Sequence, residues 1–77
     1  MVSEQRQQQS LIGSIERVTF HNEEDGYCVL RVIPKGKRVA VTVVGKVAAP
    51  HTGEELVARG DWHDDEHYGA QFRAGEI

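Results

Sequence analysis

The chain has 77 residues, enough for one small domain, and a domain of this size buries only about 60% of the surface that its unfolded form exposes. Hydrophobic residues make up 39% of the sequence and charged residues 27%, as in ordinary globular proteins. No apolar run reaches the roughly 18 residues that a membrane-spanning helix needs. The net charge of −3 weighs against a freestanding nucleic-acid binder, because binding to phosphates needs an excess of Lys and Arg.

The N-terminal segment, residues 1–10, is polar and rich in glutamine. It has neither apolar periodicity nor the apolar segment of a secretory signal. We expect it to be a disordered tail, with a short helical turn as the alternative. Residues 11–77 form the predicted folded domain.

The single cysteine, Cys28, has no partner for an internal disulfide. It lies beside Val29 and Leu30, and we interpret it as a small buried hydrophobic residue because no His or helix N-terminus near it would activate a thiol. A chain without disulfides is typical of a reducing compartment, so we expect a cytoplasmic protein.

Five stretches have the composition of short β-strands and are separated by turns that contain Gly or Pro. In chain order they are residues 11–20, 27–33, 39–45, 54–63 and 70–77. Ile15 and Val18 are three residues apart, so a β-bulge near Glu16 and Arg17 is needed for both to face the core. Gly13 fits a bend or a close approach of two backbones.

Alternation within the strands predicts which side chains form the core. In the second strand the core set is Cys28, Leu30 and Val32. In the fourth strand Trp62 is expected to be the largest apolar contribution to the core. Both phenylalanines are also expected to be buried. The connection at residues 46–53 could contain one helical turn before Pro50 ends it. The prediction is an all-β protein, a small five-stranded barrel with little or no helix.

Two clusters of polar residues could carry chemistry. The segment from His63 to His67 contains two histidines and three carboxylates, but its position between two strands favours a solvated hairpin turn over a metal site. Glu23, Glu24 and Asp25 also lie in a turn, which offers no cleft for acid–base catalysis. The sequence contains no G-x-x-x-x-G-K-[ST] motif, so we expect no ATP site of its own. We therefore predict no catalytic residues, metal or cofactor in this chain.

Basic and aromatic residues of the first half of the chain are the candidates for binding nucleic acid. Single-stranded nucleic acids bind where bases stack on aromatic rings and phosphates pair with cations. A solvated charged face is the alternative interpretation. The candidate residues are Arg17, Tyr27, Arg31, Lys35, Lys37 and Arg38.

Several blocks of the sequence, in the same order and with the same spacing, resemble the opening region of the RecD-like ATP-dependent DNA helicases (exodeoxyribonuclease V alpha-subunit-like). The blocks are residues 13–32, 41–45, 53–56, 60–62 and 69–72. The resemblance implies an OB-like Greek-key barrel over residues 11–77. It also implies a parent enzyme that unwinds DNA in the 5′-to-3′ direction with ATP and Mg, in DNA repair and recombination. The motor motifs of that family are absent here, so we expect the chain to be one domain, or a truncated product, of a longer helicase.

Two hypotheses about the domain's role follow. In the first, it guides single-stranded DNA to the helicase motor. In the second, it is a structural or protein-interaction domain that docks on the rest of the helicase or on a partner. Basic residues that converge on one face favour the first, and acids interspersed among them favour the second. We expect the isolated domain to be a monomer that binds no membrane.

Overall fold

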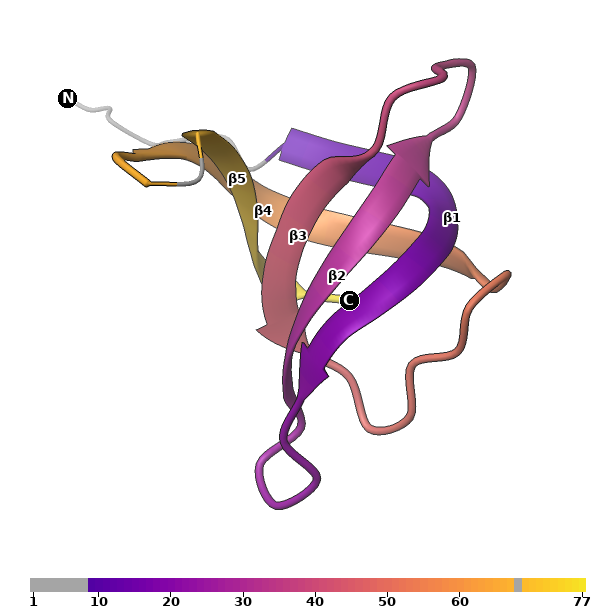
Figure 1. Ribbon diagram of the computed structural model, residues 1–77, viewed down its shortest axis with the longest axis vertical. Coiled ribbons are helices and arrows are strands. Elements are labelled where there is room, and N and C mark those ends of the chain that lie inside the picture. Colours follow the sequence, from indigo (N-terminus) through magenta and orange to yellow (C-terminus); the bar gives the residue numbers. More distant parts are fainter. Residues whose placement is uncertain (1–8, 68) are drawn as a thin grey trace, which may run out of the picture.

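The computed structural model describes residues 9–67 and 69–77 of the chain (Figure 1). The predicted disordered tail comprised residues 1–10, of which residues 1–8 lie outside the described residues. For Gln9 and Ser10 the prediction is wrong, because they begin the first strand and pair with Gly60 and Arg59. Five strands follow one another along the chain. They are β1 (Gln9–His21), β2 (Tyr27–Pro34), β3 (Val41–Lys46), β4 (Glu55–Asp65) and β5 (Gly69–Glu76).

The strands close into a barrel in the order β1-β2-β3-β5-β4, with β4 pairing back onto β1. All neighbouring strands are antiparallel except β3 and β5, which are parallel. No described residue lies in a helix, and hence no helix among them could cross a membrane. These findings confirm the predicted all-β barrel.

Strand β1 closes the barrel because it pairs with two neighbours. Gln9 to Ser14 pair with β4, and Gly13 to His21 pair with β2 (Figure 1). At Gly13 a Cβ atom would collide with the carbonyl oxygen of Ile33 and lie 2.8 Å from Cα of Pro34. The predicted close approach of two backbones at this glycine is therefore confirmed.

The pairing of β1 with β2 is irregular at two places, between Ile15 and Arg17 and between Val18 and Phe20. The first is the predicted bulge, and it turns Ile15 and Val18 toward the same interior. The second was not predicted. At this second bulge β1 has one more residue than the facing part of β2. The side chains of β1 after the bulge therefore point to the opposite face of the sheet from the one that regular alternation would give.

The core consists of aliphatic side chains and one aromatic ring. Cys28, Leu30 and Val32 of β2 are fully buried, which confirms the predicted core face of that strand. Phe72 of β5 is the largest fully buried side chain and packs with Val43 of β3 in the same cluster. No polar or charged side chain among the described residues is buried in this core.

The predicted role of Trp62 in the core is wrong, because its side chain is 43% exposed. The pairing of β1 with β4 ends at Gly60, so β4 continues beyond the closed part of the barrel with β5 beside it (Figure 1). Trp62 lies on the inward-facing side of β4, but no opposite wall covers it there. It packs edge-on against Phe72, with 5.1 Å between the ring centroids. Trp62 therefore covers one open end of the barrel and does not fill the barrel interior.

Two connections differ in detail from the sequence prediction. Strand β3 begins at Val41 rather than Val39, and Val39 is 74% exposed in the loop before it. Residues 48 and 49 form bends rather than a helical turn. The backbone N–H of Val47 instead donates to the carbonyl of Gly26, which ties this connection to the β1–β2 turn.

We predict that Gly60→Ala destabilises the domain by about 2–3 kcal/mol, the upper part of the range for overpacking. The added Cβ would collide with the carbonyl oxygen of Arg73 and lie 2.8 Å from Cα of Ala74, and these backbone atoms belong to the paired strand β5. Denaturant unfolding measures the loss. Gly36→Ala is the matched control: its Cβ would meet nothing within 4 Å, and its φ of 81° costs only about 1 kcal/mol. Equal losses in the two variants would contradict the close approach at Gly60.

Candidate nucleic-acid interface

The outer face of β1, β2 and β3 carries a shallow hollow of about 460 Å³. Its walls combine two aromatic rings, aliphatic side chains and polar groups from four strands. The lining residues are Thr19, Phe20, Tyr27, Val29, Arg31, Thr42, Val44 and Gln71. Two of the six predicted site residues, Tyr27 and Arg31, are among them.

Phe20 is 49% exposed, so its predicted burial is wrong. The extra residue that the second bulge adds to β1 places Phe20 opposite Val29, on the outer face, rather than in the core. There its ring lies 6.1 Å from the ring of Tyr27, centroid to centroid, at an angle of 57°. Tyr27 is 38% exposed. The face therefore carries two accessible aromatic rings where the sequence analysis identified one.

Two arginines lie on the same face. Arg17 on β1 pairs directly with Arg31 on β2, so their side chains project from neighbouring positions. The guanidinium of Arg31 donates from Nη1 to the Thr42 hydroxyl at 2.8 Å and from Nη2 to the Ala40 carbonyl at 3.2 Å. These bonds hold Arg31 against β3 and leave its other N–H donors available. Within the described part of the chain, neither arginine forms an ion pair with a carboxylate.

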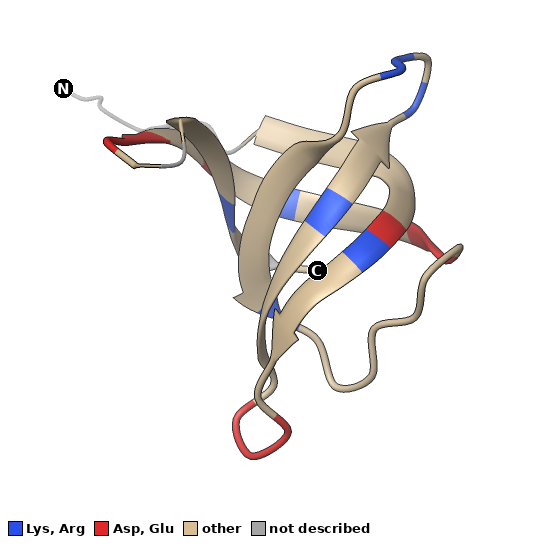
Figure 2. Cartoon of the chain, viewed as in Figure 1, with Lys and Arg blue, Asp and Glu red and all other residues tan. Residues whose placement is uncertain are grey.

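The other three predicted residues, Lys35, Lys37 and Arg38, lie in the loop between β2 and β3, at the far end of β2 from Tyr27. All three are exposed, and they border a second hollow at the mouth of the barrel. Figure 2 shows basic segments side by side on β1 and β2, and further basic segments in this loop. The structure therefore divides the predicted site into two surfaces.

A family model for the OB-fold domain of the ATP-dependent DNA helicase YrrC matches residues 8–77. The chain belongs to this family. Comparisons with curated proteins and with solved structures found no match. The closed barrel β1-β2-β3-β5-β4 is thus the OB-fold of a helicase domain.

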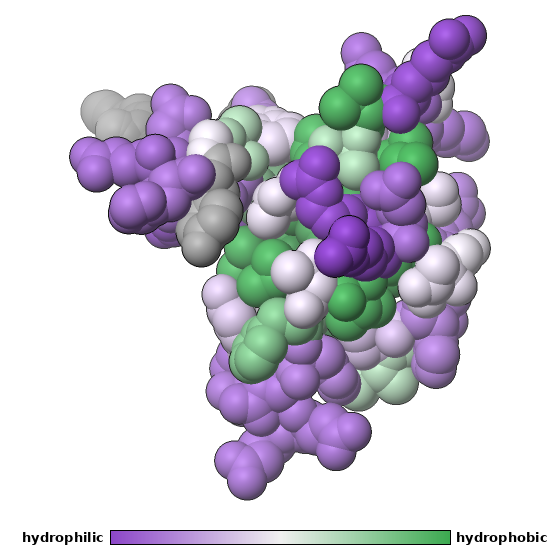
Figure 3. Space-filling view, viewed as in Figure 1, coloured by the Kyte–Doolittle hydropathy of each residue, from purple (hydrophilic) through white to green (hydrophobic). Residues whose placement is uncertain are grey.

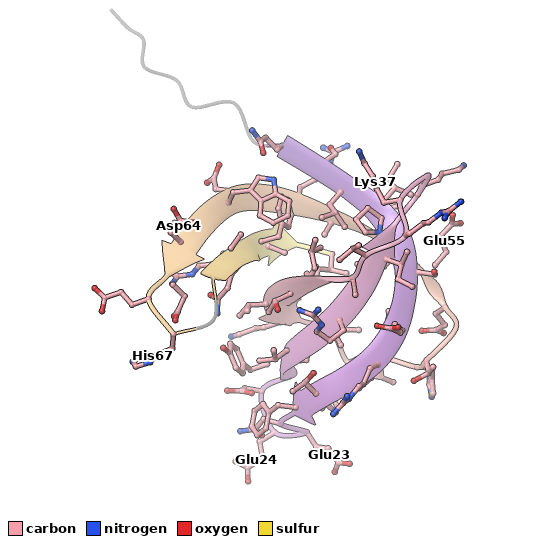
Figure 4. The ribbon with its side chains drawn as sticks, turned by 45° about the horizontal axis from the view of Figure 1, so that its top comes forward. Glu23, Glu24, Lys37, Glu55, Asp64 and His67 are labelled. Atoms are coloured by element: carbon pink, nitrogen blue, oxygen red, sulfur yellow. The ribbon has the colours of Figure 1, made fainter. Side chains whose placement is uncertain are left out.

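Three acidic residues of this OB-fold domain gather at one end of the aromatic face. Glu23, Glu24 and Asp25 form the β1–β2 turn, at the opposite end of the barrel from Lys37 (Figure 4). Two other carboxylates lie nearer the basic residues: Glu16 is exposed and adjoins Arg17 in the sequence, and Glu55 of β4 lines a hollow together with Lys35 and Lys37. The face thus has an acidic end and a mainly basic middle, and the basic loop beyond it has one carboxylate beside it.

The β1–β2 turn is shaped by its own side chains. The Asn22 side-chain oxygen accepts from the backbone N–H of Glu24 at 2.8 Å, and an Asp25 carboxylate oxygen accepts from the backbone N–H of Tyr27 at 3.0 Å. Gly26 has a φ of 80°, which other residues rarely adopt. These bonds fix the start of β2, and with it the position of Tyr27.

The segment from His63 to His67 forms the end of β4 and the turn toward β5, as predicted for a hairpin. Among the described residues no group of His, Cys, Asp and Glu is arranged to hold a metal ion. Cys28 is fully buried in the core of the OB-fold domain. Burial raises the pKa of its thiol above the ordinary value, although a backbone hydrogen bond with Val47 acts in the opposite direction. The thiolate, which is the reactive form, is therefore disfavoured.

We predict that Cys28 reacts with a thiol reagent at mildly alkaline pH on the order of 100-fold more slowly in the native domain than in denaturant. Reaction requires opening of the barrel, and burial also disfavours the thiolate. The rate is measured with a chromogenic disulfide reagent, by the absorbance of the coloured thiolate that the reagent releases when it reacts with the cysteine. Thr52→Cys in a Cys28→Ser background is the control, because residue 52 is exposed and should react at the rate of a free thiol. Equal rates for Cys28 and for the cysteine at position 52 would show that the core is open.

Proposed function

We propose that this OB-fold domain contacts single-stranded DNA through the outer face of β1, β2 and β3 and guides the strand to a helicase motor. The motor would be that of a RecD-like 5′-to-3′ helicase of DNA repair and recombination in the cytoplasm. ATP and Mg would be used by other domains of that protein, and this domain would be non-catalytic. The observation that carries the proposal is the exposed pair Phe20–Tyr27 beside the paired arginines 17 and 31.

The aromatic pair supplies what base stacking needs. Stacking of a base on an aromatic side chain contributes about 1–3 kcal/mol and tolerates any sequence, because every base has a π-face. A single exposed ring would support only weak binding. With Phe20 and Tyr27 both exposed, two successive bases have a platform.

The paired arginines supply what the phosphates need. Like charges at directly opposed positions of a sheet repel one another, and within the described residues no carboxylate is ion-paired with Arg17 or Arg31. A phosphate between them would relieve this repulsion and could bind the guanidiniums bidentately. Hydrogen bonds from Arg31 to Thr42 of β3 and to Ala40 just before that strand hold one guanidinium in place before DNA arrives, which lowers the entropic cost of binding.

The distribution of charge along the barrel favours one path for the strand. The acidic β1–β2 turn would repel phosphates from one end of the face, and the β2–β3 loop would attract them to the other. From Tyr27 to Lys35 is a distance of about 26 Å along an extended chain, at ~3.3 Å per residue. In this proposal Lys35, Lys37 and Arg38 attract the DNA electrostatically without being part of the stacking surface.

We predict that Phe20→Ala or Tyr27→Ala weakens binding of a short oligothymidylate by about five- to 100-fold, because each ring contributes about 1–3 kcal/mol of stacking. Fluorescence anisotropy of a labelled oligonucleotide at low salt measures the dissociation constant. Thermal unfolding should stay cooperative, since both rings are exposed. Loss of cooperative unfolding would show instead that these rings hold the fold together.

Arg17→Ala should weaken the binding of the oligonucleotide and also make it less dependent on salt. The slope of log K against log[salt] should become about 0.7 smaller in magnitude, which is the contribution of one phosphate contact on a single strand. Arg59→Ala is the matched control, because Arg59 is exposed on β4, where its strand neighbours are Ser10 of β1 and Glu76 of β5 rather than residues of β2. Equal effects of the two variants would mean that the domain binds DNA by net charge alone. If the unaltered domain did not bind the oligonucleotide, the DNA-binding proposal would be wrong and the hypothesis of a docking domain would replace it.

A further inference from the structure

A second hollow, of about 660 Å³, lies at the mouth of the barrel and is separate from the aromatic face. Its outer part is formed by three exposed hydrophobic side chains. Val39 in the β2–β3 loop is 74% exposed, Trp62 on β4 is 43% exposed and Ile12 on β1 is 42% exposed. We call this surface the mouth groove. Figure 3 shows hydrophobic atoms gathered beneath the hydrophilic β2–β3 loop, where the groove begins.

The rim of the mouth groove is cationic. Lys35, Lys37 and Arg38 all line it, and no Asp or Glu is among the described residues that line it. The loop that carries the cations is tied to the barrel, because the backbone N–H of Lys35 donates to the Ile12 carbonyl at 2.8 Å and that of Lys37 to the Pro34 carbonyl at 2.9 Å. The backbone of the loop is therefore held beside the apolar floor, and the cationic side chains extend from it.

We propose that the mouth groove binds a segment of another polypeptide in which carboxylates alternate with aliphatic side chains. An apolar patch with a charged rim is typical of a protein–protein interaction site, and an exposed tryptophan is a frequent anchor there. Charge complementarity selects an acidic partner, because each charged residue described in the lining of the groove is basic. The aliphatic floor, made by side chains such as Ile12, Val39 and Val41, suits Leu or Ile of the partner rather than nucleobases.

The residues of the mouth groove suit a peptide better than they suit single-stranded DNA. Single strands use aromatic platforms, and Phe20 and Tyr27 lie at the other end of β2. Among the described residues that line the groove, Trp62 is the one aromatic ring, and its edge contact with Phe72 occupies part of its surface. The two surfaces are therefore suited to different ligands, and the proposal for the mouth groove does not depend on DNA binding at the other face.

The sequence contains one tryptophan, so the intrinsic fluorescence of Trp62 reports directly on the groove. The probe is a synthetic peptide of alternating Asp and Leu with blocked ends. We expect its addition to the 77-residue chain to shift the Trp62 emission to shorter wavelength in a saturable manner, since the ring loses contact with water. Peptides with Asn in place of Asp, or Ser in place of Leu, should bind at least about tenfold more weakly.

Val39→Asp should weaken binding of the Asp–Leu peptide at least about tenfold, because it removes an apolar contact and adds a like charge. Ala48→Asp is the matched control, since it adds the same charge at an exposed position in the β3–β4 loop, outside the groove. Phe20→Ala should leave peptide binding unchanged, which separates this proposal from the binding of DNA.

Three results would overturn the proposal. The first is the absence of a shift in Trp62 emission up to the highest soluble peptide concentration. The second is equal binding of the Asp and Asn peptides, or equal binding by the Val39→Asp and Ala48→Asp variants. The third is displacement of the peptide by oligothymidylate that persists at high salt, together with loss of oligothymidylate binding in Val39→Asp but not in Val39→Ser, which would assign the groove to nucleic acid.

Discussion

The structure depends on the requirement that β1 pair with two different strands. Its first part pairs with β4 and its second part with β2, so the chain has to bend sharply where the two pairings overlap, at Gly13 and Ser14. The absence of a side chain at Gly13 lets the β2 backbone come close enough to close the barrel. With β1 in place, the parallel contact between β3 and β5 completes the closure, and every core side chain faces a common interior.

The bulges of β1 decide which residues can have a function. Each extra residue in one strand of an antiparallel pair shifts the remainder of that strand onto the opposite face. The first bulge turns Val18 inward, and the second turns Phe20 outward beside Tyr27. With the first bulge alone, Phe20 would share the inward face of Val18, and the outer face would have one ring fewer. The aromatic pair therefore depends on the second bulge, which separates the face of Phe20 from that of Val18.

Most of the fold could be predicted from the sequence, because period-2 alternation and turn residues report on local structure. Cys28, Leu30 and Val32 were placed correctly for this reason. The burial of Trp62 could not be predicted in the same way. Alternation gives the face of the strand on which a side chain lies, but it does not show how far the opposite wall of the barrel extends to cover that side chain. Phe20 was missed because its spacing from Val18 gave no sign of a second bulge. The pairing of Arg17 with Arg31, likewise, depends on a strand register that no local pattern specifies.

The division of the predicted site into two surfaces has a consequence for how the domain would work. The aromatic face and the mouth groove lie toward opposite ends of β2, so the occupant of one would not block the other. The loop cations line the groove and lie beyond the basic middle of the aromatic face. An acidic peptide in the groove would neutralise part of the charge that attracts DNA, and a bound strand would in turn weaken the peptide, since coupling between two ligands is reciprocal. Such competition would be electrostatic and would fade as salt rises. A steric overlap of the two ligands would persist at high salt, so the salt dependence of the coupling distinguishes the two arrangements.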